Sequence, residues 1–126
     1  MPSFTELNWS PCNLGNMYGA LGDHAKKRDM LERALAIDER AYGSDSAEVA
    51  VSLAGLGNAY GRLGDQAKKR DMLERALAID ERTYGRDHPK VALTLGNLGE
   101  VHVELGDAAE ARELLQRALA IHEENV

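Results

Sequence analysis

The sequence repeats itself with a period of 42 residues. The 20 residues that begin at Leu63 occur almost unchanged 42 residues earlier, at Leu21, and a diverged copy begins at Leu105. The first two units are identical at 29 of 42 aligned positions, and the third matches the second at 17 of 38. A period of about 20–50 residues is typical of proteins whose units bury their apolar faces only against one another. The period predicts a single domain, residues 1–126, with units at about 5–46, 47–88 and 89–126.

Each unit contains two helical patterns. Val49, Leu53, Leu56 and Tyr60 recur at spacings of four, three and four residues, which places them on one face of a helix. The tripeptide 63–65, Leu-Gly-Asp, combines a residue suited to ending one helix with a residue suited to capping the next. Helices are therefore predicted over 46–63, 65–84, 88–105 and 107–124.

The starts of the first helices differ between units. In unit two, Asp45 and Glu48 form the pattern of a capping box, which predicts Asp45 as the N-cap. In unit one, Pro11 occupies the position of Leu53, and a proline inside a helix costs roughly 3 kcal/mol. We therefore expect this helix to begin near residue 10, with Ser10 as its N-cap and Trp9 packed over the end of the stack.

Charge and hydropathy disfavour two classes of partner. The formal net charge is −6, whereas nucleic-acid binding needs a concentrated positive surface. No segment approaches the roughly 20 apolar residues of a membrane span, and the polar N-terminus does not resemble a signal peptide. We expect a cytoplasmic protein that binds neither nucleic acid nor membrane. The basic runs that begin at Lys26 and Lys68 are expected to form (i, i+4) ion pairs: Arg28–Glu32, Asp29–Arg33, Arg70–Glu74 and Asp71–Arg75.

Nothing in the sequence indicates catalysis. The four histidines lack the i, i+3 or i, i+4 spacing of a helical metal site, and Cys12 is the single cysteine. We expect His102 to pack in the core, His88 to start a helix and Cys12 to be at least half-buried. The prediction is a protein that is not an enzyme, with no catalytic residues, no metal and no cofactor.

The repeated pattern resembles a known family. Leu53-x-x-Leu56-Gly57-x-x-Tyr60, followed by Leu63-Gly64-Asp65, is similar to the tetratricopeptide repeat, and its 42-residue length resembles the repeats of kinesin light chains. The resemblance implies an all-α, right-handed superhelical stack of six helices in three helix-turn-helix hairpins. Lys27 and Lys69 replace the small residue usual between paired helices, so either their aliphatic stems run past the contact or the helices move apart.

The same resemblance implies function. In tetratricopeptide repeats the first helices line a concave groove that binds an extended or helical peptide, which predicts a protein-interaction scaffold. Arg62 is the one cation expected in this groove, so clamping of a peptide carboxylate is disfavoured. The alternative is end-to-end self-association through the terminal repeat faces, where Leu114, Ala118 and Ile121 lack a successor. The predicted ligand-binding residues are Asn13, Asn16, Asn58, Arg62, Asn97 and Glu100.

Overall fold

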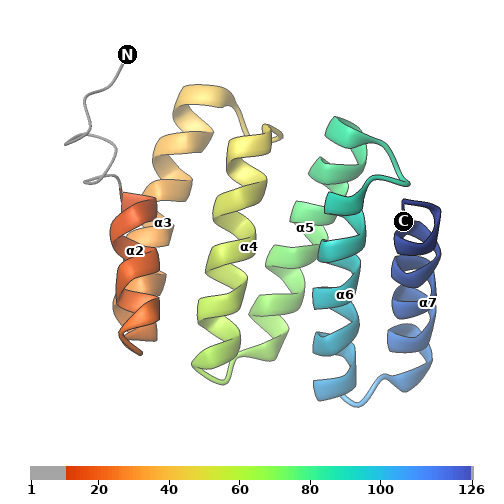
Figure 1. Cartoon of the computed structure of the whole chain (residues 1–126). Helices are drawn as coiled ribbons and strands as arrows, with labels where there is room; N and C mark the ends of the chain where they lie inside the picture. The colour runs from red at the N-terminus through yellow and green to blue at the C-terminus, as the bar shows by residue number, and fades with distance from the viewer. Residues whose placement is uncertain (1–10, 126) are drawn as a thin grey trace.

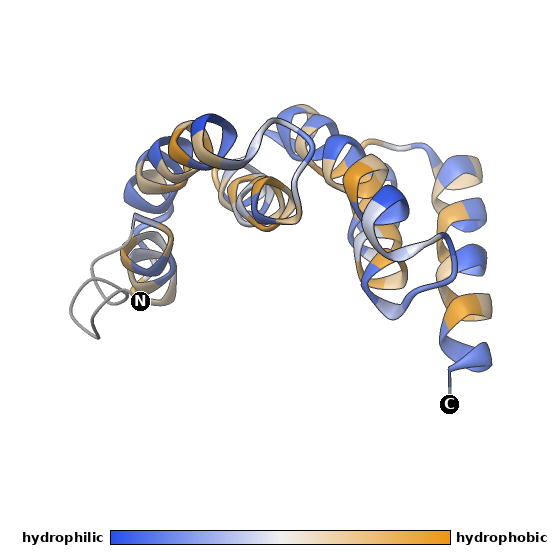
Figure 2. Cartoon of the chain, turned by 90° about the horizontal axis from the view of Figure 1, so that it is seen from above, coloured by the Kyte–Doolittle hydropathy of each residue, from blue (hydrophilic) through white to orange (hydrophobic). Residues whose placement is uncertain are grey.

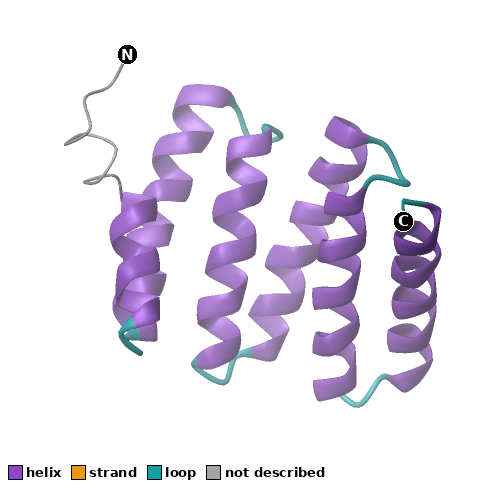
Figure 3. Cartoon of the chain, in the orientation of Figure 1, coloured by secondary structure: helices purple, strands orange, loops and turns teal. Residues whose placement is uncertain are grey.

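The computed structural model describes residues 11–125, and every regular element in that range is a helix (Figure 3). The ends of the four predicted helices agree with the observed ones to within one residue. The expected roles of Trp9 and Ser10 lie outside the described residues. The helices are α2 (Pro11–Ala20), α3 (His24–Tyr42), α4 (Ala47–Arg62), α5 (Gln66–Tyr84), α6 (Pro89–Glu104) and α7 (Ala108–Glu124).

The six helices form three hairpins that stack side by side (Figure 1). Each helix packs against the next one along the chain, and α2 also touches α4. Seen from above, the stack curves into an arc (Figure 2). The first helices of the hairpins, α2, α4 and α6, lie toward the inner side of the arc, and α3 and α5 lie toward its outer side.

The turn inside each hairpin follows from the Leu-Gly-Asp tripeptide. Gly64 has a φ of +91°, a left-handed conformation that costs a residue with a Cβ atom. Asp65 then accepts a hydrogen bond from the amide of Lys68 at 3.1 Å and caps α5. The same cap recurs 42 residues earlier and later, at Asp23 and Asp107. The predicted stop and cap are confirmed.

The start of α4 corrects one prediction. Ser46, not Asp45, is the N-cap, and its hydroxyl accepts from the amide of Val49 at 3.3 Å. Asp45 instead forms an ion pair with Arg82 at 3.1 Å. Both residue types are good caps, and Ser46 takes the role because it directly precedes the first helical residue, Ala47.

A continuous core runs between the helices along the stack. The predicted stripe of Val49, Leu53, Leu56 and Tyr60 is buried. Buried apolar residues of α5 pack against it and against α6, and burying one such leucine stabilises a fold by roughly 1.5–3 kcal/mol. The core therefore joins each unit to its neighbours.

The predicted (i, i+4) ion pairs are wrong. Arg28 pairs with Asp29 at 3.1 Å, and Arg70 pairs with Asp71 at 3.2 Å. Arg75 pairs with Glu39 of the preceding unit at 3.5 Å. The (i, i+4) spacing within one helix cannot predict this contact, because its two residues belong to different helices.

Candidate functional site: the inner groove

Two adjoining hollows lie on the inner side of the arc, between α4 and α6. One has a volume of about 330 Å³ and the other of about 260 Å³. Asn58, Lys69 and Glu100 line both hollows, so the two form one groove. Its walls come from the exposed faces of α4 and α6, and its base comes from the first turns of α5. The remaining lining residues are Ala54, Gly55, Gly61, Arg62, Gln66, Leu73, Asn97 and Glu104.

Four of the six predicted ligand-binding residues lie together in this groove. Asn58 and Arg62 project from α4, and Asn97 and Glu100 project from α6. Asn13 and Asn16 lie one unit away on α2 and line neither hollow. The side-chain amide of Asn16 points at the Cys12 sulfur, 3.9 Å away.

Lys69 is a groove cation that the sequence interpretation missed. A methyl group added at Gly61 would lie 2.6 Å from the Lys69 Cδ, so the lysine stem rests on the bare glycine backbone. Gly19 and Lys27 make the same contact in unit one, also at 2.6 Å. The helices therefore stay close while each lysine stem crosses their contact, which decides between the two alternatives.

A paired change in the sequence accompanies this contact. In unit three, Val103 occupies the position of Gly61 and Ala111 occupies that of Lys69. A large residue on one helix thus accompanies a small one on the other, in either order. This exchange is the feature of the sequence that could have indicated the contact between Lys69 and Gly61. The position of Lys69 corrects the expectation that Arg62 is the one cation in the groove.

Charges of both signs line the groove. No ion pair within 4.0 Å joins Arg62, Lys69 or Glu100 to any residue in the described range 11–125. Toward unit one, burial and the nearby Arg62 guanidinium lower the pKa of Lys27. Amide groups of Asn58 and Asn97 can donate to and accept from a peptide backbone. The groove thus offers amides and unpaired charges to a polar chain.

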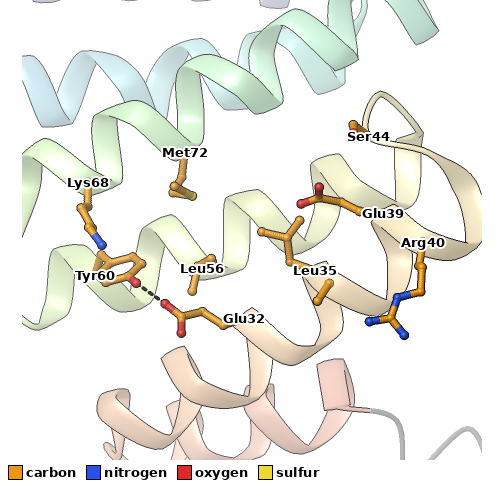
Figure 4. Close-up of a pocket in the computed structure, with 10 residues that line it drawn as sticks. Glu32, Leu35, Glu39, Arg40, Ser44, Leu56, Tyr60, Lys68 and Met72 are labelled. Carbon is orange, nitrogen blue, oxygen red and sulfur yellow. Dashed lines mark hydrogen bonds between the residues drawn. The ribbon is translucent and has the colours of Figure 1, made fainter.

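A separate hollow, of about 630 Å³, opens on the outer side of the arc between α3 and α5 (Figure 4). Leu35, Leu56 and Met72 form its apolar floor. At one end the Tyr60 hydroxyl donates a hydrogen bond to Glu32, and the Lys68 ammonium lies 4.9 Å from the centre of the Tyr60 ring. The sequence interpretation treated these residues as core and solvated surface and did not predict the hollow.

Burial, followed by the hydrogen bond to Glu32, raises the pKa of Tyr60 to about 12. The phenol therefore keeps its proton at neutral pH and acts as a donor. Its hydrogen bond to Glu32 joins α4 to α3 at this end of the outer hollow.

The histidines and the cysteine that were considered as catalytic or metal-binding candidates make structural contacts. His102 is mostly buried and lies 3.8 Å from the Asp107 carboxylate, His88 caps α6, and Cys12 is half-buried, with its pKa raised chiefly by burial. Within residues 11–125, no three His, Cys, Asp or Glu side chains cluster so that they could hold a metal ion. None of the described helices combines the length and apolar character needed to cross a membrane.

Comparison with known proteins agrees with this architecture. The family model described as tetratricopeptide repeat matches residues 6–82 and 70–124. No curated protein matches the sequence. A structure described as a kinesin light chain with nearly identical TPR-like repeats, from Podosopora anserina, is 25% identical with a TM-score of 0.84. The alignment covers 95% of this chain and 57% of that one.

Two further solved structures are similar. BtubC (BKLC) from P. vanneervenii is 30% identical, with a TM-score of 0.84, over 90% of this chain and 46% of that chain. The TPR domain of Arabidopsis FLU is 20% identical, with a TM-score of 0.81, over 91% of this chain and 93% of that chain. The chain thus spans about half the length of the first two structures. The predicted all-α superhelical stack, with repeats of the kinesin light chain type, is confirmed.

Proposed function

The chain belongs to the tetratricopeptide repeat family, and on that premise we propose that it binds an extended or helical peptide segment in the inner groove. Repeats of this family form protein-interaction scaffolds rather than enzymes, and the proposal includes no catalytic activity and a cytoplasmic location. The observation that supports the groove is the convergence of Asn58, Asn97 and Glu100 on one continuous hollow.

The chemistry of the groove favours a polar chain over a compact small molecule. Asparagine amides can hydrogen-bond to both backbone groups of a peptide, and they lie on two successive first helices. Arg62 and Lys69 can meet acidic side chains, whereas Glu100 and Glu104 can meet basic ones. Because these charges nearly balance, we expect modest salt dependence of binding. The proposed contact set extends along the arc to Asn13 and Asn16.

A phage-displayed library of random peptides can supply the probe. Peptides selected on the 126-residue chain are titrated into isotope-labelled protein while amide shifts are recorded. We expect the shifts to map to the inner faces of α4 and α6. Asn58→Ala and Asn97→Ala should each weaken binding about tenfold, since each loses hydrogen bonds to the peptide.

Arg40→Ala is a matched control because Arg40 lines the outer hollow. Its affinity for the selected peptide should stay within about twofold of wild type, as expected for a residue outside the interface. Shifts confined to α3 and to the outer face of α5 would place the site in the outer hollow. That result would contradict the proposal.

A further inference from the structure

The two joints between units are built from the same contacts, 42 residues apart. Arg75 pairs with Glu39 of the preceding unit at 3.5 Å and donates to the carbonyl of Ser44 at 3.2 Å. One unit later, Arg117 pairs with Glu81 at 3.2 Å and donates to the carbonyl of Arg86 at 3.3 Å. An arginine of α5 and one of α7 thus each tie their unit to the one before it.

The same joints share a polar bond and an apolar contact. Ser52 donates to Asp38 at 2.9 Å, and Thr94 donates to Asp80, also at 2.9 Å. The apolar contact places Leu73 of α5 in the core beside Leu98 and Val101 of α6, and Leu31 has the same role one unit earlier. Each joint between units thus consists of an arginine ion pair, a hydrogen bond to an aspartate and an apolar contact.

Leu114, Ala118 and Ile121, which the sequence placed on the free face of the last helix, pack instead against α6 within unit three. The exposed face of α7 presents one half of this joint, and we call it the tail face (Leu115, Leu119 and Glu123). Leu115 corresponds to Leu73 but is 41% exposed where Leu73 is 1% exposed. Leu119 is 56% exposed and lines both of two adjoining, largely apolar hollows of about 400 Å³ each. Glu123 stands at the position of Glu81 and is exposed.

The face of unit one presents the other half, and we call it the head face (Leu14, Met17 and Arg33). Met17 corresponds to Ala59 and Val101, which are 0% exposed in the joints, yet Met17 is 49% exposed. Arg33 stands at the position of Arg75 and is exposed. No ion pair within 4.0 Å joins Arg33 or Glu123 to another residue of the described chain.

We propose that the tail face of one copy of this chain binds the head face of a second copy, in the register of the internal joints. Leu115 and Leu119 pack against Leu14 and Met17 of the second copy, and Glu123 pairs with its Arg33. The occupant is a second copy because the charges and apolar positions of the two faces match the halves of a joint that the chain already makes twice. The contact joins two different faces, so it can propagate into longer assemblies.

Two substitutions make this contact weaker than an internal joint. His122 occupies the position of Asp80, so the Thr94–Asp80 bond has no counterpart there. Pro11 occupies the position of the buried Leu53, which reduces the apolar area of the head face. The contact is separate from the two hollows between α4 and α6, because neither face includes a residue that lines them.

Sedimentation velocity across low to high micromolar concentrations of the 126-residue chain tests the proposal. We expect the mean mass to rise with concentration in the wild type. Glu123→Arg and Arg33→Glu should each weaken association about tenfold or more, because each sets like charges against one another. An equimolar mixture of the two variants should recover association, since the arginine introduced into one variant then meets the glutamate introduced into the other.

Glu113→Arg is the matched control, because it makes the same charge change at an exposed position of α7 outside the tail face. It should associate as the wild type does. Circular dichroism establishes that each variant is folded before its mass is interpreted. A wild-type monomer at every concentration would overturn the proposal, and so would a mixture of the variants that associates no better than either alone.

Discussion

At the residue scale, burial shifts the pKa of a carboxyl group even where that group accepts a hydrogen bond. Asp80 is 8% exposed and accepts a hydrogen bond from Thr94 at 2.9 Å. Burial raises the pKa of Asp80, and the bond from Thr94 and the charges of Lys90 and His88 offset only part of this effect. The joint between units two and three therefore carries a carboxylate whose charge opposes folding at neutral pH.

This shift predicts a pH-dependent effect of Asp80→Asn. Because the pKa of Asp80 is higher in the folded state, that state binds the proton more tightly, and its contribution to the unfolding free energy rises as pH falls through the raised pKa. The amide that replaces the carboxylate still accepts from Thr94 but carries no charge. We expect the stability of the variant relative to wild type to be greatest near pH 7 and to decline toward pH 4. Urea unfolding at several pH values measures it.

Asp38→Asn provides the comparison for that experiment. Asp38 makes the equivalent bond, to Ser52 at 2.9 Å, but it is only half-buried. Measuring this variant beside Asp80→Asn separates the effect of burying the carboxylate from the effect of replacing a hydrogen-bonded carboxylate by an amide. An Asp80→Asn effect that is constant from pH 7 to pH 4 would contradict the assigned cause.

At the element scale, the sequence predicted what is decided locally. The helix ends were found because Gly64 and Asp65 act within a single turn of chain. Lys69 was missed because the residue it contacts, Gly61, belongs to another helix. The cap was misplaced by one residue because Asp45 and Ser46 are adjacent and both are good caps. Four groove residues were predicted from helical spacing along one helix face. Helical spacing cannot predict Lys69, because its side chain crosses the contact between two helices.

The contact between Gly61 and Lys69 predicts a coupled effect on stability. In the wild type, an alanine methyl at position 61 meets the lysine stem, which must move aside. With Lys69→Ala already present, Gly61→Ala should stabilise by about 0.5–1 kcal/mol, because alanine favours a helix interior over glycine. The gain should be smaller when Lys69 is retained. Urea melts of the two single variants and the double variant give the coupling, and additive effects would contradict the contact.

At the scale of the whole molecule, stability in a stack is approximately a sum of unit and joint contributions. Units one and two are identical at 29 of 42 positions, and Pro11 in place of Leu53 is one of the substitutions that separate them. Within the described residues, α2 comprises 10 residues from Pro11 onward, whereas α4 and α6 have 16 each. Unit two, which comprises α4 and α5, packs on a neighbouring unit on each side within the described chain.

Native-state hydrogen exchange should reveal this gradient. We expect the slowest backbone amides in α4 and α5 and faster exchange in α2, because local opening needs less energy where fewer buried contacts are lost. Exchange followed by mass spectrometry at low micromolar protein separates these segments as peptides. Protection in α2 and α3 equal to that in α4 and α5 would contradict the gradient. Repeating the measurement at high concentration connects it to assembly, because a head-to-tail contact should slow exchange in α2 and α7 and leave α4 unchanged.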